Sequence, residues 1–240
     1  MFKIRCSQIS KIMGPIGLTD LQKVELAELE ARESGNGKPL TAKQAETLEK
    51  LRNKPSDLPA GAISYLKEWY AEQLFNDGEE IYSKYTDKGN MCEAEAIDMI
   101  AENLGYCFLD KNEEHLSNSF LTGTPDIITE NYVLDAKCPF NGKTFLEACT
   151  GKLNNDYWWQ MQGYMALTGL MVAKVCYCLI DTPEDCNYGR AVSYQSAPYR
   201  FKAFHVDRDE GAITAIANRV AMCNEWLKKY ELEVQNAFSS

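Results

Sequence analysis

The sequence contains few histidines, no long apolar run and no excess of positive charge. His115 and His205 are the only histidines in 240 residues, which argues against a zinc site or a histidine-based catalytic triad. There is no apolar run of about 18 residues and no N-terminal signal pattern, so we expect a soluble, cytoplasmic protein without a membrane partner. The net charge of −10 argues against broad polyanion binding, but it leaves room for a local basic groove.

The nine cysteines form an odd number and are scattered through predicted helices and strands. This distribution favours free thiols in a reducing cytoplasm over a disulfide framework. Cys176 and Cys178 alternate on a predicted strand and Cys186 follows, with a spacing that matches no common cluster-ligand pattern. We interpret the two strand cysteines as small apolar residues.

The length fits one α/β domain or two small ones, and we expect a single domain over residues 1–240. Residues 18–59 predict an αα-hairpin insertion, with one helix through Leu21, Val24, Leu26 and Leu29 and a second from Thr41 to about Asn53. Both helices are rich in charges of mixed sign. This favours a solvated surface feature; the alternative is an arm that contacts DNA or a partner.

The apolar and turn patterns also predict the other elements. Helices are expected over residues 60–75, 86–104, 143–150, 156–168 and 207–230, and strands over residues 106–109, 115–121, 172–180 and 199–206. An extended entry over residues 2–5 leads into a helix that starts near Ser7, which is a good N-cap. The alternative role for that helix terminus is binding of a phosphate.

Residues 120–140 predict a hairpin that brings two acids and a lysine together. Glu130 and Asn131 form a two-residue turn between β-prone runs, which sets Asp126 opposite Asp135. Directly opposed residues have Cβ atoms about 4.5–5.5 Å apart, so the two carboxylates repel unless a cation or proton lies between them. Lys137 points from the same strand face as Asp135. The alternative is an Asp–Lys ion pair on a solvent-facing strand.

Glu93 is predicted to extend the apolar stripe of its helix, four residues before Ile97. A carboxylate on a buried stripe needs a partner, because an unpaired buried charge is very costly. It is either a salt-bridged glutamate near the helix start or a third acid directed at the hairpin. Oxygen ligands from Glu93, Asp126 and Asp135 suit Mg²⁺ or Mn²⁺, which activate water for phosphodiester hydrolysis. Lys137 would orient or deprotonate that water, or offset charge in the transition state.

The helix over residues 156–168 carries two further polar candidates. Gln160 and Tyr164 are four residues apart and share a face. Trp158 and Trp159 lie on the same helix, and their spacing beside methionines predicts that one of them is a core residue. The alternative for these tryptophans is stacking on bases.

Four ordered motifs give the chain a resemblance to the PD-(D/E)XK nuclease superfamily, and within it to the lambda exonuclease and YqaJ-type viral recombinases. The motifs are Pro125-Asp126, Asp135-Ala-Lys137, Gln160-x-x-x-Tyr164 and the Gly89-x-x-x-Glu93 helix, and Arg5-Cys6-Ser7-Gln8 resembles the N-terminal segment of these enzymes. The resemblance implies an α/β fold with a restriction-endonuclease-like core, in which helices flank a mixed central sheet. The 18–59 hairpin is an insertion in this comparison.

The resemblance also implies roles for individual residues. Glu93, Asp126 and Asp135 would bind Mg²⁺, with the carbonyl of Ala136 as a further ligand, and Lys137 would be catalytic. Gln160 and Tyr164 would position DNA or Lys137, and Arg5 and Ser7 would bind the substrate. Some RecB-like nucleases in the superfamily carry an iron–sulfur cluster near the position of Cys176, which is the alternative role for the cysteines.

These residues predict a metal-dependent DNA exonuclease of a viral or prophage recombination system, active on linear duplex DNA in the host cytoplasm. A homo-oligomer and a single-strand annealing protein are the expected partners besides DNA. One alternative is an endonuclease on the same core, acting at a sequence or a junction. Another is a non-cleaving DNA-binding protein on the same scaffold.

Overall fold

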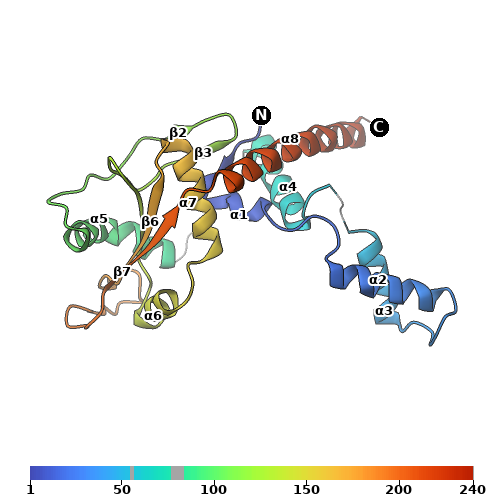
Figure 1. Ribbon diagram of the computed structural model, residues 1–240, viewed down its shortest axis with the longest axis horizontal. Helices are drawn as coiled ribbons and strands as arrows, with labels where there is room; N and C mark the ends of the chain where they lie inside the picture. The colour runs from blue at the N-terminus through green and yellow to red at the C-terminus, as the bar shows by residue number, and fades with distance from the viewer. Residues whose placement is uncertain (55–56, 77–83, 240) are drawn as a thin grey trace. The chain divides into compact units, whose positions relative to one another are not determined.

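The computed structural model describes residues 1–54, 57–76 and 84–239 (Figure 1). The chain forms two compact units, and the first is built mainly of helices from Met1–Phe2, Lys11–Asp77 and Asn218–Ser240. The second unit comprises Lys3–Ser10 and Gly78–Ala217 and contains the strands. Among the described residues, no helix has the length and apolar character needed to cross a membrane. The expectation of a single domain over residues 1–240 stays a prediction.

The helical unit contains the predicted αα-hairpin. Helices α2 (Asp20–Glu33) and α3 (Ala42–Arg52) each begin with a threonine capping box, from Thr19 and Thr41. Leu29, Leu48 and Leu51 form a small shared core between them. Leu21 and Val24 of the predicted helix are 84% and 57% exposed, and the shared core uses the α2 face that carries Leu29. Helix α4 (Ala60–Phe75) confirms the third predicted helix.

The second unit holds two mixed sheets, which confirms the α/β class. In the smaller sheet the strand order is β1-β3-β2, formed by β1 (Ile4–Arg5), β3 (Leu121–Gly123) and β2 (Leu116–Ser117). The larger sheet has the order β4-β5-β6-β7, formed by β4 (Ile127–Ile128), β5 (Val133–Lys137), β6 (Val172–Cys178) and β7 (Phe201–Asp207). Strands β5 and β6 are parallel, and the two outer pairs are antiparallel.

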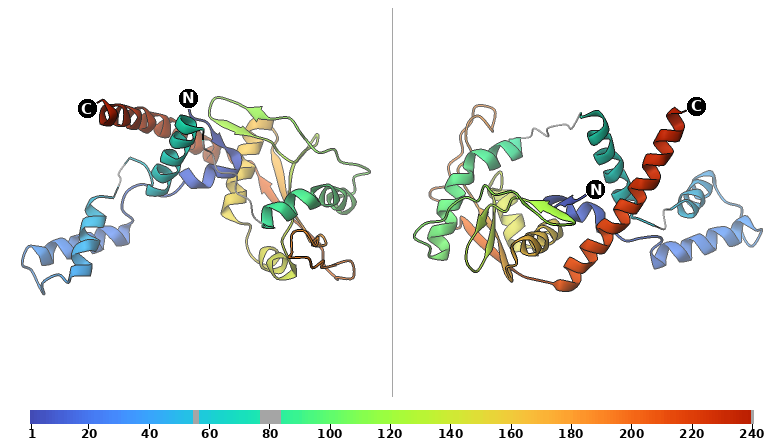
Figure 2. Two further views of the ribbon diagram at one scale, coloured as in Figure 1. Left: turned by 180° about the vertical axis from the view of Figure 1, so that it is seen from behind. Right: turned by 90° about the horizontal axis from the view of Figure 1, so that it is seen from above.

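Helices flank the larger sheet on both faces. Side chains of α5 (Lys84–Leu104) pack against Leu134, Cys176 and Cys178. Because side chains alternate along a strand, Asp135 and Tyr177 point to the other face, where α7 (Asn155–Thr168) meets them. Figures 1 and 2 show α5 and α7 on opposite sides of the strands. This arrangement puts β5, the strand that carries Asp135 and Lys137, between two helices that carry polar side chains.

The remaining elements of the chain are the 3₁₀ helix η1 (Cys6–Gln8), α1 (Ile9–Ile12), α6 (Gly142–Thr150) and α8 (Glu210–Phe238). The α8 helix continues eight residues past the predicted end at Tyr230. Gly169, with φ of 77°, ends α7 as predicted.

Two local predictions are wrong. Ser7 is not an N-cap, because it lies inside η1, whose cap position is Arg5 and has no side-chain hydrogen bond. Residues 106–109 form no strand, and only Leu116–Ser117 and Leu121 of the predicted 115–121 strand are extended in a sheet. Cys107 and Phe108 are adjacent and both exposed, so this segment lacks the alternating burial that a sheet strand needs.

Candidate active site

The β4–β5 hairpin has the register predicted from its turn. Ile127 pairs with Leu134 and Ile128 with Val133, and Thr129 N donates to the carbonyl of Tyr132 at 2.9 Å. Asp126 directly precedes β4, and its Oδ2 accepts a hydrogen bond of 2.8 Å from the backbone N–H of Ala136. The side chain of Asp126 therefore reaches β5 beside Asp135.

Asp135 and Lys137 form a close ion pair on one face of β5. The Nζ atom of Lys137 lies 2.6 Å from Asp135 Oδ2, and the two side chains are 23% and 1% exposed. This burial excludes the alternative of a solvent-facing strand pair. Lys137 also lies over the ring of Tyr157, with 4.8 Å between Nζ and the ring centroid.

The hairpin holds two buried carboxylates close together, and this arrangement shifts the pKa values of its charged groups. Burial, reinforced by the charge of Asp135, raises the pKa of Asp126 to about 7. Burial alone would lower the pKa of Lys137, but the charges of Asp135 and Asp126 outweigh it and raise that pKa. Near neutral pH, Lys137 is therefore a fixed cation, and Asp126 is the carboxyl group most easily protonated.

Gln160 and Tyr164 support the hairpin from α7, as their shared face predicts. Gln160 Nε2 donates to Asp135 Oδ1 at 3.2 Å and to Tyr164 Oη at 3.0 Å. The hydroxyl of Tyr164 donates in turn to the carbonyl of Thr124 at 3.1 Å. This chain of bonds fixes one oxygen of Asp135 and leaves the other to a cation.

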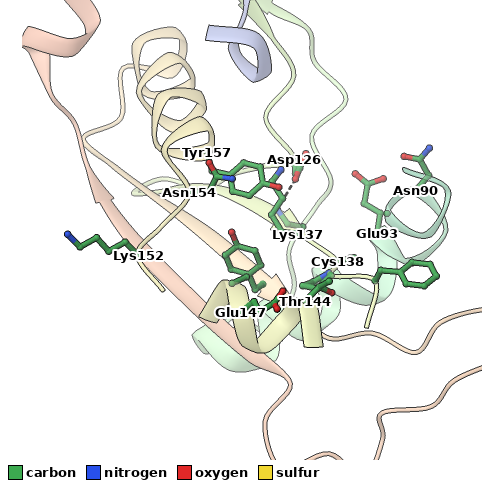
Figure 3. A pocket seen from close by; sticks show the side chains of 16 residues that line it. Asn90, Glu93, Asp126, Lys137, Cys138, Thr144, Glu147, Lys152, Asn154 and Tyr157 are labelled. Atoms are coloured by element: carbon green, nitrogen blue, oxygen red, sulfur yellow. Dashed lines mark hydrogen bonds between the residues drawn. The ribbon is translucent and has the colours of Figure 1, made fainter. Parts of the chain in front are cut away.

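An open cleft of about 800 Å³ lies over these residues. Figure 3 shows Glu93 and Asn90 of α5 on one side, Asn154 and Tyr157 of α7 on the other, and Lys137 between them. The cleft is lined by Gly89, Asn90, Glu93, Asp126, Ala136, Lys137, Cys138, Pro139, Phe140, Thr144, Glu147, Ala148, Lys152, Asn154, Tyr157 and Tyr177.

Glu93 reaches the cleft but is paired with a lysine that the sequence did not suggest. Its Oε2 atom lies 2.6 Å from Lys111 Nζ, and the Glu93 side chain is 27% exposed. Within the described ranges, no three His, Cys, Asp or Glu side chains are grouped closely enough to hold a metal ion. Glu93 thus forms the predicted salt bridge and lines the same cleft as Asp126, and its role as a third metal ligand stays a prediction.

The N-terminal candidates lie apart from this group of residues. Arg5 and Ser7 are exposed on β1 and η1, and neither lines the cleft. Cys6, which lies between Arg5 and Ser7, packs closely against α7. A Cβ atom added to Gly163 of α7 would lie 2.8 Å from Cys6 Sγ. A glycine at this position lets α7 approach η1.

The cysteines and tryptophans take structural positions. Cys176 and Cys178 are fully buried in the core between α5 and the sheet, and burial raises the pKa of Cys176 to about 12. Cys186 is buried with its sulfur 3.4 Å from that of Met91. Trp158 and Trp159 are half-buried and meet edge to face, with 4.8 Å between ring centroids. Neither is buried, so the prediction that one of them is a core residue is wrong.

Sequence reasoning missed Lys111, Asn154, Tyr157 and Tyr177. Tyr157 had a usable signal, because it lies one helical turn before Gln160 and hence on the same face. Lys111 had none, since it follows no periodic pattern and meets Glu93 across 18 residues. Tyr177 was hidden in a continuous apolar strand.

The donor set fits a hard divalent cation. Asp135 Oδ2 is buried and accepts no hydrogen bond of normal geometry. Among the described residues, the positive charge paired with it is the Lys137 ammonium. The adjacent carboxylate of Asp126 is destabilised in its charged form by Asp135. Two such oxygens beside each other are the ligands that Mg²⁺ or Mn²⁺ prefers.

No protein-family model and no curated protein matches the sequence, whereas solved structures do. A phage-related exonuclease from Haemophilus somnus 129PT has a TM-score of 0.68 and 25% identity, over 97% of this chain and 96% of that one. The alkaline exonuclease LHK-Exo from Laribacter hongkongensis has a TM-score of 0.63 and 17% identity, over 99% and 95%. Its complex with dAMP gives 0.62 and 18%, over 99% and 94%. Over nearly its whole length, the chain therefore has the fold of phage-related and alkaline exonucleases, the lambda exonuclease and YqaJ-like type that its motifs predicted.

Proposed function

We propose that this protein is a metal-dependent DNA exonuclease that degrades linear duplex DNA in viral or prophage recombination. One observation carries the proposal: Asp126 and Lys137 line an open cleft and the buried Asp135 is ion-paired with Lys137, on the fold of phage-related exonucleases. LHK-Exo was solved with dAMP, and a deoxynucleoside monophosphate is the product that we propose for this cleft.

In this proposal Asp126, Asp135, the carbonyl of Ala136 and Glu93 would hold Mg²⁺ or Mn²⁺. A bound divalent ion supplies Lewis-acid polarisation of the phosphodiester and lowers the pKa of an attacking water. The Ala136 N–H fixes one Asp126 oxygen, and Gln160 fixes one Asp135 oxygen. Preorganised oxygens of this kind cost no rearrangement during the reaction.

Lys137 acts as a cation at the scissile phosphate. In the metal-free protein its neighbouring carboxylates raise its pKa, so it is a cation at neutral pH. Its ammonium would offset the charge that develops on the phosphate oxygens or orient the water. The ring of Tyr157 beneath Nζ limits where that ammonium can move.

Arg5 and Ser7 are proposed as contacts to the DNA backbone, since both are exposed polar residues at the N-terminal segment. A homo-oligomer and a single-strand annealing protein complete the proposal as partners. Both would hold the enzyme at the end of a duplex for successive cleavages.

The proposal is tested with duplex DNA labelled at its 5′ or 3′ end, beside a covalently closed circle. The wild type should release mononucleotides from linear DNA with Mg²⁺ but not with EDTA, and it should leave the circle intact. Asp135→Asn should be inactive at an unchanged unfolding temperature. Cleavage of the circle would show an endonuclease instead, and hydrolysis of no DNA with Mg²⁺ or Mn²⁺ would show a non-cleaving protein.

A further inference from the structure

Lys111 is a cation at the rim of the cleft that lies outside every motif discussed above. Its Nζ atom is 2.6 Å from Oε2 of Glu93, and its side chain is 49% exposed. The neighbouring residues Asp110, Glu113 and Glu114 are exposed acids, so Lys111 is the one cation in this five-residue segment. The ion pair with Glu93 therefore involves this one lysine, and it does not result from a loop with many basic residues.

The backbone of this segment is tied to the acidic hairpin. The N–H of Asn112 donates to the carbonyl of Asp126 at 2.7 Å, and Asn112 Nδ2 donates to the carbonyl of Pro125 at 2.9 Å. Leu109, two residues before Lys111, is buried in the core beneath α5. The backbone on both sides of Lys111 is thus anchored beside the hairpin, while the Lys111 side chain is 49% exposed.

The two lysines at the site differ in what they can do when a cation enters. Lys137 is paired with the buried Asp135, and its side chain is 23% exposed, against 49% for Lys111. Lys111 holds Glu93 from the solvent side, where a long flexible side chain exchanges partners at little cost. A metal ion that takes Glu93 leaves the Lys111 ammonium without its partner, among acids and next to the cleft. A phosphate of DNA bound in the cleft would then compete with the exposed acids Asp110, Glu113 and Glu114 for the ammonium.

We propose that Lys111 is a substrate-binding residue that exchanges Glu93 for a phosphate of the bound DNA strand. This inference rests on the proposed nuclease function of the same cleft. Lys111 competes with the metal ion for Glu93 in the absence of DNA, and it contacts the DNA backbone once the ion is bound. By reciprocity, DNA that draws Lys111 away from Glu93 strengthens metal binding.

The test compares full-length wild type with Lys111→Met and with Lys50→Met. Lys50 is the matched control because it forms an exposed ion pair of the same length, 2.6 Å, with Glu46 on α3. Calorimetry measures Mn²⁺ binding to each protein without DNA. Fluorescence anisotropy measures binding of a labelled linear duplex, once in Ca²⁺ and once in EDTA. Ca²⁺ takes the place of Mg²⁺ because its looser coordination limits hydrolysis.

Lys111→Met should bind Mn²⁺ about two- to fivefold more tightly, the size of one lost surface ion pair. In Ca²⁺ it should bind DNA several-fold more weakly, with a salt slope smaller by about one, and in EDTA it should match the wild type. Unchanged or weaker Mn²⁺ binding, or unchanged DNA binding in Ca²⁺, would overturn the exchange. Failure of the wild type to bind Mn²⁺ would instead remove the proposed metal site, which distinguishes the two failures.

Discussion

Gln160 of α7 donates a hydrogen bond of 3.2 Å to Oδ1 of Asp135 on β5, and both side chains are buried. The same Nε2 atom lies 3.0 Å from the hydroxyl of Tyr164. The bond connects the helix to the strand that carries the acid and the lysine. It thereby decides which Asp135 oxygen is available to a cation, and Oδ2 is the one left.

Replacing Gln160 by leucine should weaken metal binding and hydrolysis by about 10- to 100-fold, the usual cost of losing a residue that orients a metal ligand. Calorimetry with Mn²⁺ and nuclease assays measure the two effects. Gln162→Leu is the matched control, because Gln162 is also buried on α7 but bonds to Asp207 and Asp209. The control should lower the unfolding temperature without a change in metal affinity, and an equal metal effect in both variants would contradict the assignment.

The raised pKa of Asp126 predicts how stability and metal binding change with pH. With a pKa of about 7 in the folded state against 3.8 ordinarily, folded Asp126 binds a proton that the unfolded chain has released. Between those values the folded state binds more protons, so the metal-free stability from this group falls as pH rises toward 7. Metal affinity should rise over the same range, since a metal ion binds the deprotonated carboxylate.

Thermal unfolding in EDTA between pH 5 and 8 measures this effect. The wild type should lose unfolding temperature as pH rises, and Asp126→Asn should lose less because its amide does not titrate. Parallel curves for the two proteins would show that Asp126 titrates at an ordinary pKa.

Lys137→Met should abolish hydrolysis while the protein still binds Mn²⁺. The change removes the cation at the phosphate, and losses of about 10²–10³ in rate are typical for one such electrostatic contact. If Lys137 acts as a cation and not as a base, wild-type activity should not increase by lysine deprotonation up to pH 9. Single-turnover rates against pH provide the measurement. A rate that rises with one proton lost above pH 8 would indicate that Lys137 is the base.

The hairpin could be predicted from the sequence because its geometry is local. A two-residue turn and strand periodicity fix which residues face each other, so the pairs Ile127–Leu134 and Ile128–Val133 followed from Glu130 and Asn131 alone. The Gln160 and Tyr164 face followed in the same way from helical spacing. The family resemblance implied that they position DNA or Lys137, and the hydrogen bond from Gln160 to Asp135 was not predicted.

The contacts of irregular segments could not be predicted. Lys111 and Asn112 are placed by hydrogen bonds to backbone carbonyls and by one buried leucine, and such bonds leave no repeating pattern in the sequence. The Ser7 cap failed for a related reason. A 3₁₀ turn over Cys6–Gln8 satisfies its backbone locally, so the serine hydroxyl is not needed there.

Lys88 provides a last prediction, about how the cleft wall is held. Its side chain is fully buried, and Nζ donates to the carbonyls of Pro139, Phe140 and Ile180 and to Thr182 Oγ1, at 2.8–3.1 Å. These acceptors follow the ends of β5 and β6, so Lys88 ties α5 to both strands. Lys88→Met keeps the length of the side chain but removes the ammonium that donates to these acceptors.

The free energy of unfolding of Lys88→Met should fall by about 2–4 kcal/mol, because several buried carbonyls then lose this donor. Urea unfolding at pH 7 measures the loss. Thr182→Val is the control: it removes one of the four acceptors and the Thr182 bond to Phe140, and should cost about 1–2 kcal/mol. A Lys88→Met loss no larger than that of Thr182→Val would mean that water replaces the ammonium. In that case Lys88 would not be what holds the cleft wall at Pro139 and Phe140.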